Sequence, residues 1–228
     1  MRVLLDNADL VAWAFATTLA LFLVSGVLSL LLGTLLVTMR VGPVAILRRA
    51  AATYVTVVRN TPLVIVFIFF RYALPKVGVQ FSFVDVVIGD LRMNNFFTAA
   101  VFALTFYTST FVCEALRSGV NAVPLGQAEA ARAIGLPFSG AMTQVVLPQA
   151  VRASVPPLAS VQIALLKNTT VAGVFGVTEA AFRMQGFTND YPTERLGIFL
   201  GFAIIFVVLV EIVSAGAHRA ERRMRVAR

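Results

Sequence analysis

The chain has 228 residues, of which 59% are hydrophobic and 13% are charged, and its mean hydropathy is +0.87. A soluble domain of this size cannot carry so much apolar side-chain area on its surface, so the composition indicates an integral membrane protein. The formal charge of +8 would also suit a nucleic-acid-binding protein, but basic residues that face anionic membrane lipid explain it, and we expect no nucleic acid as a partner.

Long apolar stretches predict about five transmembrane helices, at approximately 10–39, 62–74, 96–115, 153–182 and 196–217. The second stretch is short for a span unless residues 54–58 belong to the same helix, interrupted at 60–62. The fourth is long enough that it should break near residues 167–170. We therefore expect an all-α integral membrane fold, with residues 1–228 in one transmembrane domain.

Arginine clusters predict the orientation in the membrane. They follow the first, third and fifth stretches, at residues 40–59, 117–152 and 219–228, whereas the other loops and the N-terminal tail mix acidic and basic residues. Basic segments stay on the cytoplasmic side, so we expect the N-terminus outside and the C-terminus in the cytoplasm. The acidic N-terminal tail and the long first stretch argue against a cleaved signal peptide.

Residues 121–148 form a polar insert in this apolar sequence. Pro124 suits the first position of a helix and Gly135 suits a left-handed cap, so a helix of about three turns is expected between them. Four alanines would keep this helix slim enough to enter a groove on another protein: Ala128, Ala130, Ala131 and Ala133. Glu129 and Arg132 lie three residues apart and could instead pair with each other, as on an ordinary solvated loop.

Residue types that carry catalysis or bind metals are scarce. Cys113 is the single cysteine and His218 the single histidine, which leaves no intrachain disulfide and no cluster of metal ligands. The sequence also lacks the G-x-S-x-G and Walker motifs that hydrolases and ATPases use. We therefore expect no catalytic residue, no metal site and no cofactor on this chain, so its energy must come from a partner.

The insert resembles the E-A-A signature of ABC importer permeases, E-A-A-x3-G-x9-I-x-L-P. The matching residues are Glu129, Ala130, Ala131, Gly135, Val145 in place of the usual isoleucine, Leu147 and Pro148. Residues 54–62 (Y-V-T-V-V-R-N-T-P), 107–127 and 167–170 (K-N-T-T) resemble the polar amino-acid importer permeases of the histidine, glutamine and glutamate type. The sequences of these motifs are most similar to those of actinobacterial glutamate permeases, although Ser109, Thr110 and Cys113 occupy positions where many relatives have alanine.

The resemblance implies a type I ABC importer permease fold in the bacterial cytoplasmic membrane. Residues 121–148 would be the cytoplasmic coupling loop, with the residues that contact the ATPase being Gln127, Glu129, Ala130, Ala131, Gly135, Leu147 and Pro148. It also implies two ATP-binding cassette subunits that hold ATP and Mg, an extracellular solute-binding protein, and a second permease chain, expected to be a paralogue in preference to a second copy. A channel or secondary carrier for a small anionic solute is the alternative, but it would not need this loop.

A lysine within an apolar stretch marks the expected substrate path. Lys167 lies roughly 22 Å along a helix from Arg152, near the middle of the membrane, where a lysine is costly unless it faces a polar path. Helix breaks at 60–62 and 168–170 would expose backbone donors and hydroxyls at a similar depth. The expected path residues are Lys167, Asn168, Thr170, Arg59, Asn60 and Thr61. Such groups also tie helices together in purely structural membrane subunits, and Arg59 could hold a lipid phosphate instead.

These cationic, amide and hydroxyl groups suit a carboxylate, and no acidic residue lies along residues 60–74 to receive a basic amino acid. We therefore expect an acidic or neutral amino acid as the substrate, with glutamate first and aspartate and glutamine next. Among the other ionisable residues, helical spacing predicts two ion pairs: Glu114 with Arg117, and Glu179 with Arg183 near the outer face.

Overall fold

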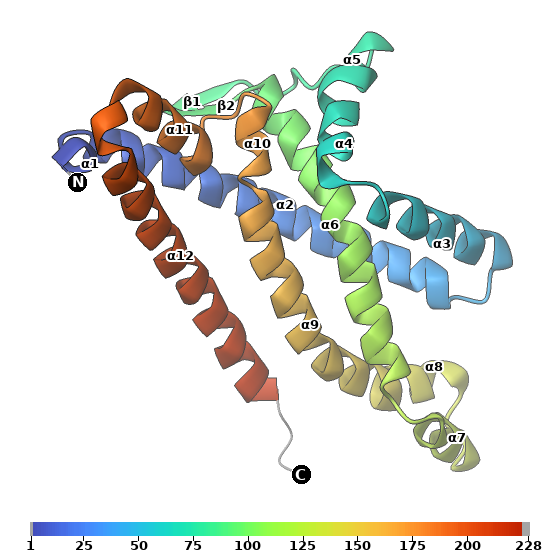
Figure 1. Cartoon of the computed structure of the whole chain (residues 1–228). Helices are drawn as coiled ribbons and strands as arrows, with labels where there is room; N and C mark the ends of the chain where they lie inside the picture. Colours follow the sequence, from blue (N-terminus) through green and yellow to red (C-terminus); the bar gives the residue numbers. More distant parts are fainter. Residues whose placement is uncertain (1, 225–228) are drawn as a thin grey trace.

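The computed structural model describes residues 2–224 and consists mainly of helices (Figure 1). This agrees with the helical membrane fold that the composition predicts. Within the described residues, one element pair departs from helix: a small antiparallel hairpin of β1 (Val86–Ile88) and β2 (Leu91–Met93). Gly89 turns between the two strands with a φ of 61°, a conformation that glycine adopts without strain.

The predicted apolar stretches correspond to five helical segments. Three helices are each long and apolar enough to cross a membrane: α2 (Ala8–Val41), α6 (Asn95–Asn121) and α12 (Arg195–Met224). α3 (Ala45–Arg59) and the segment of α4 (Leu63–Ile68), the π-helix η1 (Phe69–Ala73) and α5 (Leu74–Lys76) are long and apolar enough only when taken together. They are bent by 106° at the break, which is the geometry of a broken span or of a re-entrant loop. The remaining segment, α9 (Leu147–Asn168), has 22 residues, about 33 Å at 1.5 Å per residue. It is less apolar than the three long helices and contains Pro156 and Pro157.

Both predicted helix breaks are present. α3 stops at Arg59, three residues before Pro62, because a proline has no N–H to continue the helix and disfavours helical backbone at the residue before it. Pro62 itself is extended, with a ψ of 137°, and α4 starts directly after it. α9 ends at Asn168, and the short helix α10 (Val171–Val174) follows after two threonines. The helices are therefore interrupted at two places within the apolar stretches, and the chain bends by 106° at the first of them.

Small residues let the central helices approach closely. A side chain on Gly33 of α2 would place its Cβ 2.4 Å from Val112 of α6, and one on Gly119 of α6 would place it 1.9 Å from Ser154 of α9. Neither position can hold a larger residue without moving a helix, as is common where membrane helices pack. α6 is thus held between α2 and α9 at the centre of the bundle (Figure 1).

The connecting segments gather at two opposite ends of the molecule (Figure 1). At one end lie α7 (Leu125–Ala133), α8 (Phe138–Ala141) and the π-helix η2 (Met142–Val146), which leads into α9. At the other end lie α1 (Arg2–Asp6), the β-hairpin, α11 (Ala180–Asp190) and the 3-10 helix η3 (Pro192–Glu194). The polar insert therefore projects from the end that is far from the hairpin.

One of the two predicted ion pairs is wrong. Arg183 of α11 pairs with Asp90 in the hairpin turn instead of with Glu179. The buried Glu179 precedes α11, and its carboxylate accepts hydrogen bonds from the backbone N–H groups of Ala181 and Phe182 at 2.9 and 2.8 Å. Both oxygens are used to cap the helix, which is how an acidic side chain satisfies free N–H groups at a helix N-terminus.

Candidate coupling loop and translocation groove

The polar insert contains the predicted helix with the predicted end. α7 spans nine residues, about two and a half turns, and Pro124 lies directly before it as its N-cap instead of within its first turn. Gly135 follows the helix with a φ of 92°, the left-handed conformation that a C-terminal glycine cap requires. Its N–H donates to the carbonyl of Arg132 at 3.0 Å, which closes the end of the helix.

The outer surface of this insert is apolar and exposed. Leu125, Ile134 and Phe138 are 81%, 82% and 70% exposed. Glu129 and Arg132 are also exposed, and they form no ion pair in the described part of the chain. The alternative that they pair with each other, as on an ordinary solvated loop, is therefore not seen. Large apolar side chains held in solvent around a free carboxylate are typical of a protein-binding surface.

The residues that match the E-A-A signature divide between two faces. Gln127, Glu129, Ala130 and Gly135 are exposed, as are Leu147 and Pro148 at the start of α9. Ala131 is only 4% exposed and packs inside the insert. The exposed set is available to a partner, whereas Ala131 positions α7 against the rest of the loop.

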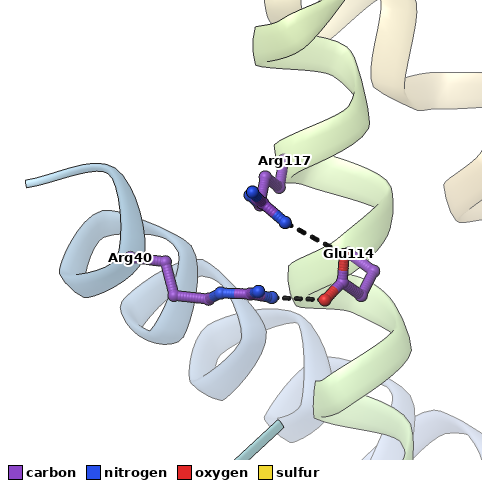
Figure 2. Close-up of polar contacts among 3 residues, drawn as sticks. All are labelled: Arg40, Glu114 and Arg117. Atoms are coloured by element: carbon purple, nitrogen blue, oxygen red, sulfur yellow. Dashed lines mark hydrogen bonds and ion pairs between the residues drawn. The ribbon is translucent and has the colours of Figure 1, made fainter. Parts of the chain in front are cut away.

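A carboxylate of α6 joins this helix to the last turn of α2 (Figure 2). Glu114 of α6 pairs with Arg40 at the end of α2 and lies 3.8 Å from Arg117, one turn further along α6. The pair with Arg117 is the one predicted from the sequence, and the shorter one with Arg40 joins residues 74 positions apart. The last turn of α2 is thus fixed to α6 about two turns before α6 ends.

A groove of about 370 Å³ lies between α6 and α9. Its lining is Tyr107, Thr108 and Phe111 from α6, and Ser160, Val161, Ala164, Leu165 and Asn168 from α9. The hydroxyl of Thr108 is buried and has no hydrogen-bond partner among the described residues. Because a buried polar group normally finds a partner, this hydroxyl is available to a molecule that enters the groove.

The structure brings some of the predicted path residues to this groove. Asn168 lines it directly, at the last position of α9. Lys167 is exposed beside Asn168 but is not part of the lining. The guanidinium of Arg59 lies 5.8 Å from the ring centre of Phe111, which itself lines the groove.

The predicted hydroxyls use their hydrogen atoms locally. Thr61 donates to the carbonyl of Val57 at 2.8 Å and Thr170 to that of Lys167 at 2.8 Å, while Asn60 is exposed at the end of α3. The sequence prediction also missed Tyr107, Thr108 and Ser160, whose only signal was their polarity within apolar helices. Their shared position depends on which faces of α6 and α9 meet.

Comparison with known proteins gives a consistent result. Residues 26–226 match the family described as "Binding-protein-dependent transport system inner membrane component". The glutamate transport system permease proteins GluC of Corynebacterium glutamicum and Corynebacterium efficiens are 39% and 41% identical to this chain, with 93% of each chain covered. A solved amino acid ABC transporter with histidines superposes with a TM-score of 0.84 at 25% identity, over 97% of both chains.

Proposed function

The chain belongs to the binding-protein-dependent transport system inner membrane component family, and on that premise we propose that it forms the path for an acidic amino acid, glutamate first, in an ATP-driven importer. It is a multi-pass membrane permease of the ABC importer class and not an enzyme. The alternative of a channel or secondary carrier is less well supported, because the family and the relatives are those of importers.

The chemistry of the groove supports an acidic substrate. Asn168 and the free hydroxyl of Thr108 offer hydrogen-bond donors, and Lys167, which precedes Asn168 in the chain and is exposed outside the lining, is the nearest lysine in the sequence. No acidic side chain lines the groove to hold the amino group of a basic substrate. Among the relatives, the GluC proteins are named for glutamate, GltJ of Escherichia coli K12 for glutamate and aspartate, and GlnM of Bacillus subtilis for glutamine.

The exposed insert supports a proposal about energy coupling. We assign residues 121–148 as the loop that an ATPase subunit receives in a groove, with two such subunits holding ATP and Mg. Leu125, Ile134 and Phe138 would bury their apolar area there, and Glu129 would meet a basic residue of the ATPase. The insert would then be cytoplasmic, with the C-terminus on the same side and the N-terminus outside, in one domain of residues 1–228.

The remaining partners follow from the same proposal. Most of α12 is exposed, as are many aliphatic side chains on α2, so a second permease chain has apolar surface to cover in addition to that left for lipid. We favour a paralogue over a second copy. A solute-binding protein would deliver the amino acid to the end that carries the β-hairpin.

Transport into vesicles tests the function. The assembled transporter, reconstituted with ATP and saturating binding protein, should take up glutamate, and Lys167→Met should abolish that uptake while basal ATPase activity and assembly persist. Lys76, the other lysine of the chain, is exposed on α5 and provides the matched control: Lys76→Met should transport normally. Absence of glutamate uptake by the unmodified transporter would refute the proposed substrate. Normal uptake by Lys167→Met would remove that lysine from the path.

A further inference from the structure

A second polar cavity lies at the end of the molecule opposite α7 (Figure 1). Its volume is about 290 Å³, and it is enclosed by η1 and α5, the loop that follows them, and the first turns of α6. Its polar lining groups are Arg71, Gln80, Ser82 and Asn95. It shares no lining residue with the groove between α6 and α9, so it is a separate site.

Arg71 is held in this cavity by aromatic rings and not by an acid. Its guanidinium carbon lies 4.1 Å from the ring centre of Phe96 and 5.2 Å from that of Tyr72. It forms no ion pair within the described chain, and its buried Nε has no hydrogen-bond partner there. An arginine without a partner near the end of a membrane span is costly, which indicates a function that offsets the cost.

The way Arg71 is held favours one ligand chemistry. Rings that contact the guanidinium fix its plane and leave its N–H groups free at the edge. Those groups form a planar fork that matches the two oxygens of a carboxylate.

The other lining groups agree with a small anion. The amides of Gln80 and Asn95 and the hydroxyl of Ser82 can donate hydrogen bonds, and no carboxylate lines the cavity to compete for Arg71. Asp85, in the same loop as Ser82, is exposed and does not belong to the lining, and Asp90 of the hairpin turn is paired with Arg183. A volume at the lower limit of ligand sites suits a small dicarboxylate better than a peptide or an oligosaccharide.

We propose that this cavity binds the carboxylate of a free acidic amino acid at the outer face of the permease. The identification of the ligand as an amino acid rests on the proposed function, whereas the carboxylate chemistry rests on the cavity alone. A lipid phosphate has related oxyanion chemistry, but Gln80 and Ser82 belong to the loop between α5 and β1 and not to a membrane span. Both side chains are exposed in that loop, so a dissolved anion can reach them.

Binding to the assembled transporter in lipid nanodiscs tests this site. Glutarate, titrated calorimetrically without binding protein and in a Lys167→Met background that removes the charge beside the groove, should bind saturably, whereas 1,5-diaminopentane should not. Arg71→Gln should weaken glutarate binding roughly tenfold or more, the loss expected for a charge-assisted pair. Arg92→Gln, at an exposed arginine of the hairpin, is the matched control and should leave the affinity unchanged. An equal affinity in Arg71→Gln, or no glutarate binding at all, would overturn the proposal.

Further measurements distinguish a loss of glutarate binding from failed assembly, from binding of a lipid headgroup and from a loss of transport. If Arg71→Gln does not assemble, Ser82→Ala and Arg71→Lys replace it, and both should bind glutarate more weakly because each loses part of the hydrogen-bonding geometry. Arg71-dependent binding of anionic lipid, with no binding of glutarate, would assign the cavity to headgroups and overturn the proposal. Glutarate binding without glutamate uptake would refute the transported substrate and leave the cavity site intact, whereas uptake without Arg71-dependent binding would do the reverse.

Discussion

The link between Arg40 and Glu114 predicts a measurable coupling between α2 and α6. Two unit charges about 4 Å apart interact by about 1 kcal/mol in water and by about 4 kcal/mol at an effective dielectric constant near 20. The side chains of Arg40 and Glu114 are 13% and 29% exposed, so the pair lies between these limits. Desolvation removes part of the gain, and we expect a net coupling of about 1–3 kcal/mol.

Arg117 provides an internal control for this estimate. Its side chain is 43% exposed and lies 3.8 Å from the same carboxylate, so its coupling to Glu114 should stay below about 1 kcal/mol, as for surface pairs. Two double-mutant cycles share the change Glu114→Gln and combine it with Arg40→Met or Arg117→Met. The free energy of unfolding of each variant can be measured by titrating the purified permease in mixed micelles with a denaturing detergent.

The test compares the coupling energy of Arg40 and Glu114 with that of Arg117 and Glu114, and the first should be larger. A larger coupling energy for Arg117 than for Arg40, or a value near zero for both, would refute the conclusion that Arg40 and Glu114 hold the two helices together. Additive effects of Arg40→Met and Glu114→Gln would refute it as well, since residues that do not interact have additive effects on stability.

Two other predictions follow from the insert and from the outer loop. Gly135→Val should weaken copurification of the ATPase and abolish transport while membrane insertion persists, because a φ of 92° costs a β-branched residue about 1–3 kcal/mol. Gly186→Val, on α11 in open space and without a positive φ, should retain both, and ATPase binding by both variants would contradict the role of the cap. A reporter inserted after Gly78, whose surroundings are open, should be external, and one after Ala217 should be cytoplasmic; a cytoplasmic signal at Gly78 would reverse the proposed orientation.

Local features of this chain were predictable because their causes are local. Apolar length predicted the membrane helices, Pro62 predicted the bend before α4, and Gly135 predicted the end of α7. Proline and glycine restrict the backbone conformation at their own positions, and a long apolar segment favours lipid over water. No knowledge of distant contacts is needed to predict either effect.

Features that depend on two distant segments were not predictable in this way. Arg117 lies within one turn of Glu114 and is a suitable partner for it. Nothing in the sequence indicates that Arg40 lies closer to the Glu114 carboxylate than Arg117 does. Glu179 and Arg183 have the spacing of an ion pair, but the start of α11 after Glu179 makes the carboxylate a cap. The cavity at Arg71 was missed for the same reason, because the loop that encloses it returns to η1 only in the folded chain.

The two prolines within α9 have a mechanical consequence. Neither can donate a backbone hydrogen bond, so the carbonyls of Arg152 and Ala153 lose their usual partners and the helix is least stiff at that turn. The turn at Pro156 lies about 12 Å along the helix from Pro148 and about 18 Å from Asn168. If the helix pivots at this turn, a displacement of about 1 Å at Pro148 becomes about 1.5 Å at Asn168, the end of the groove that is far from the turn.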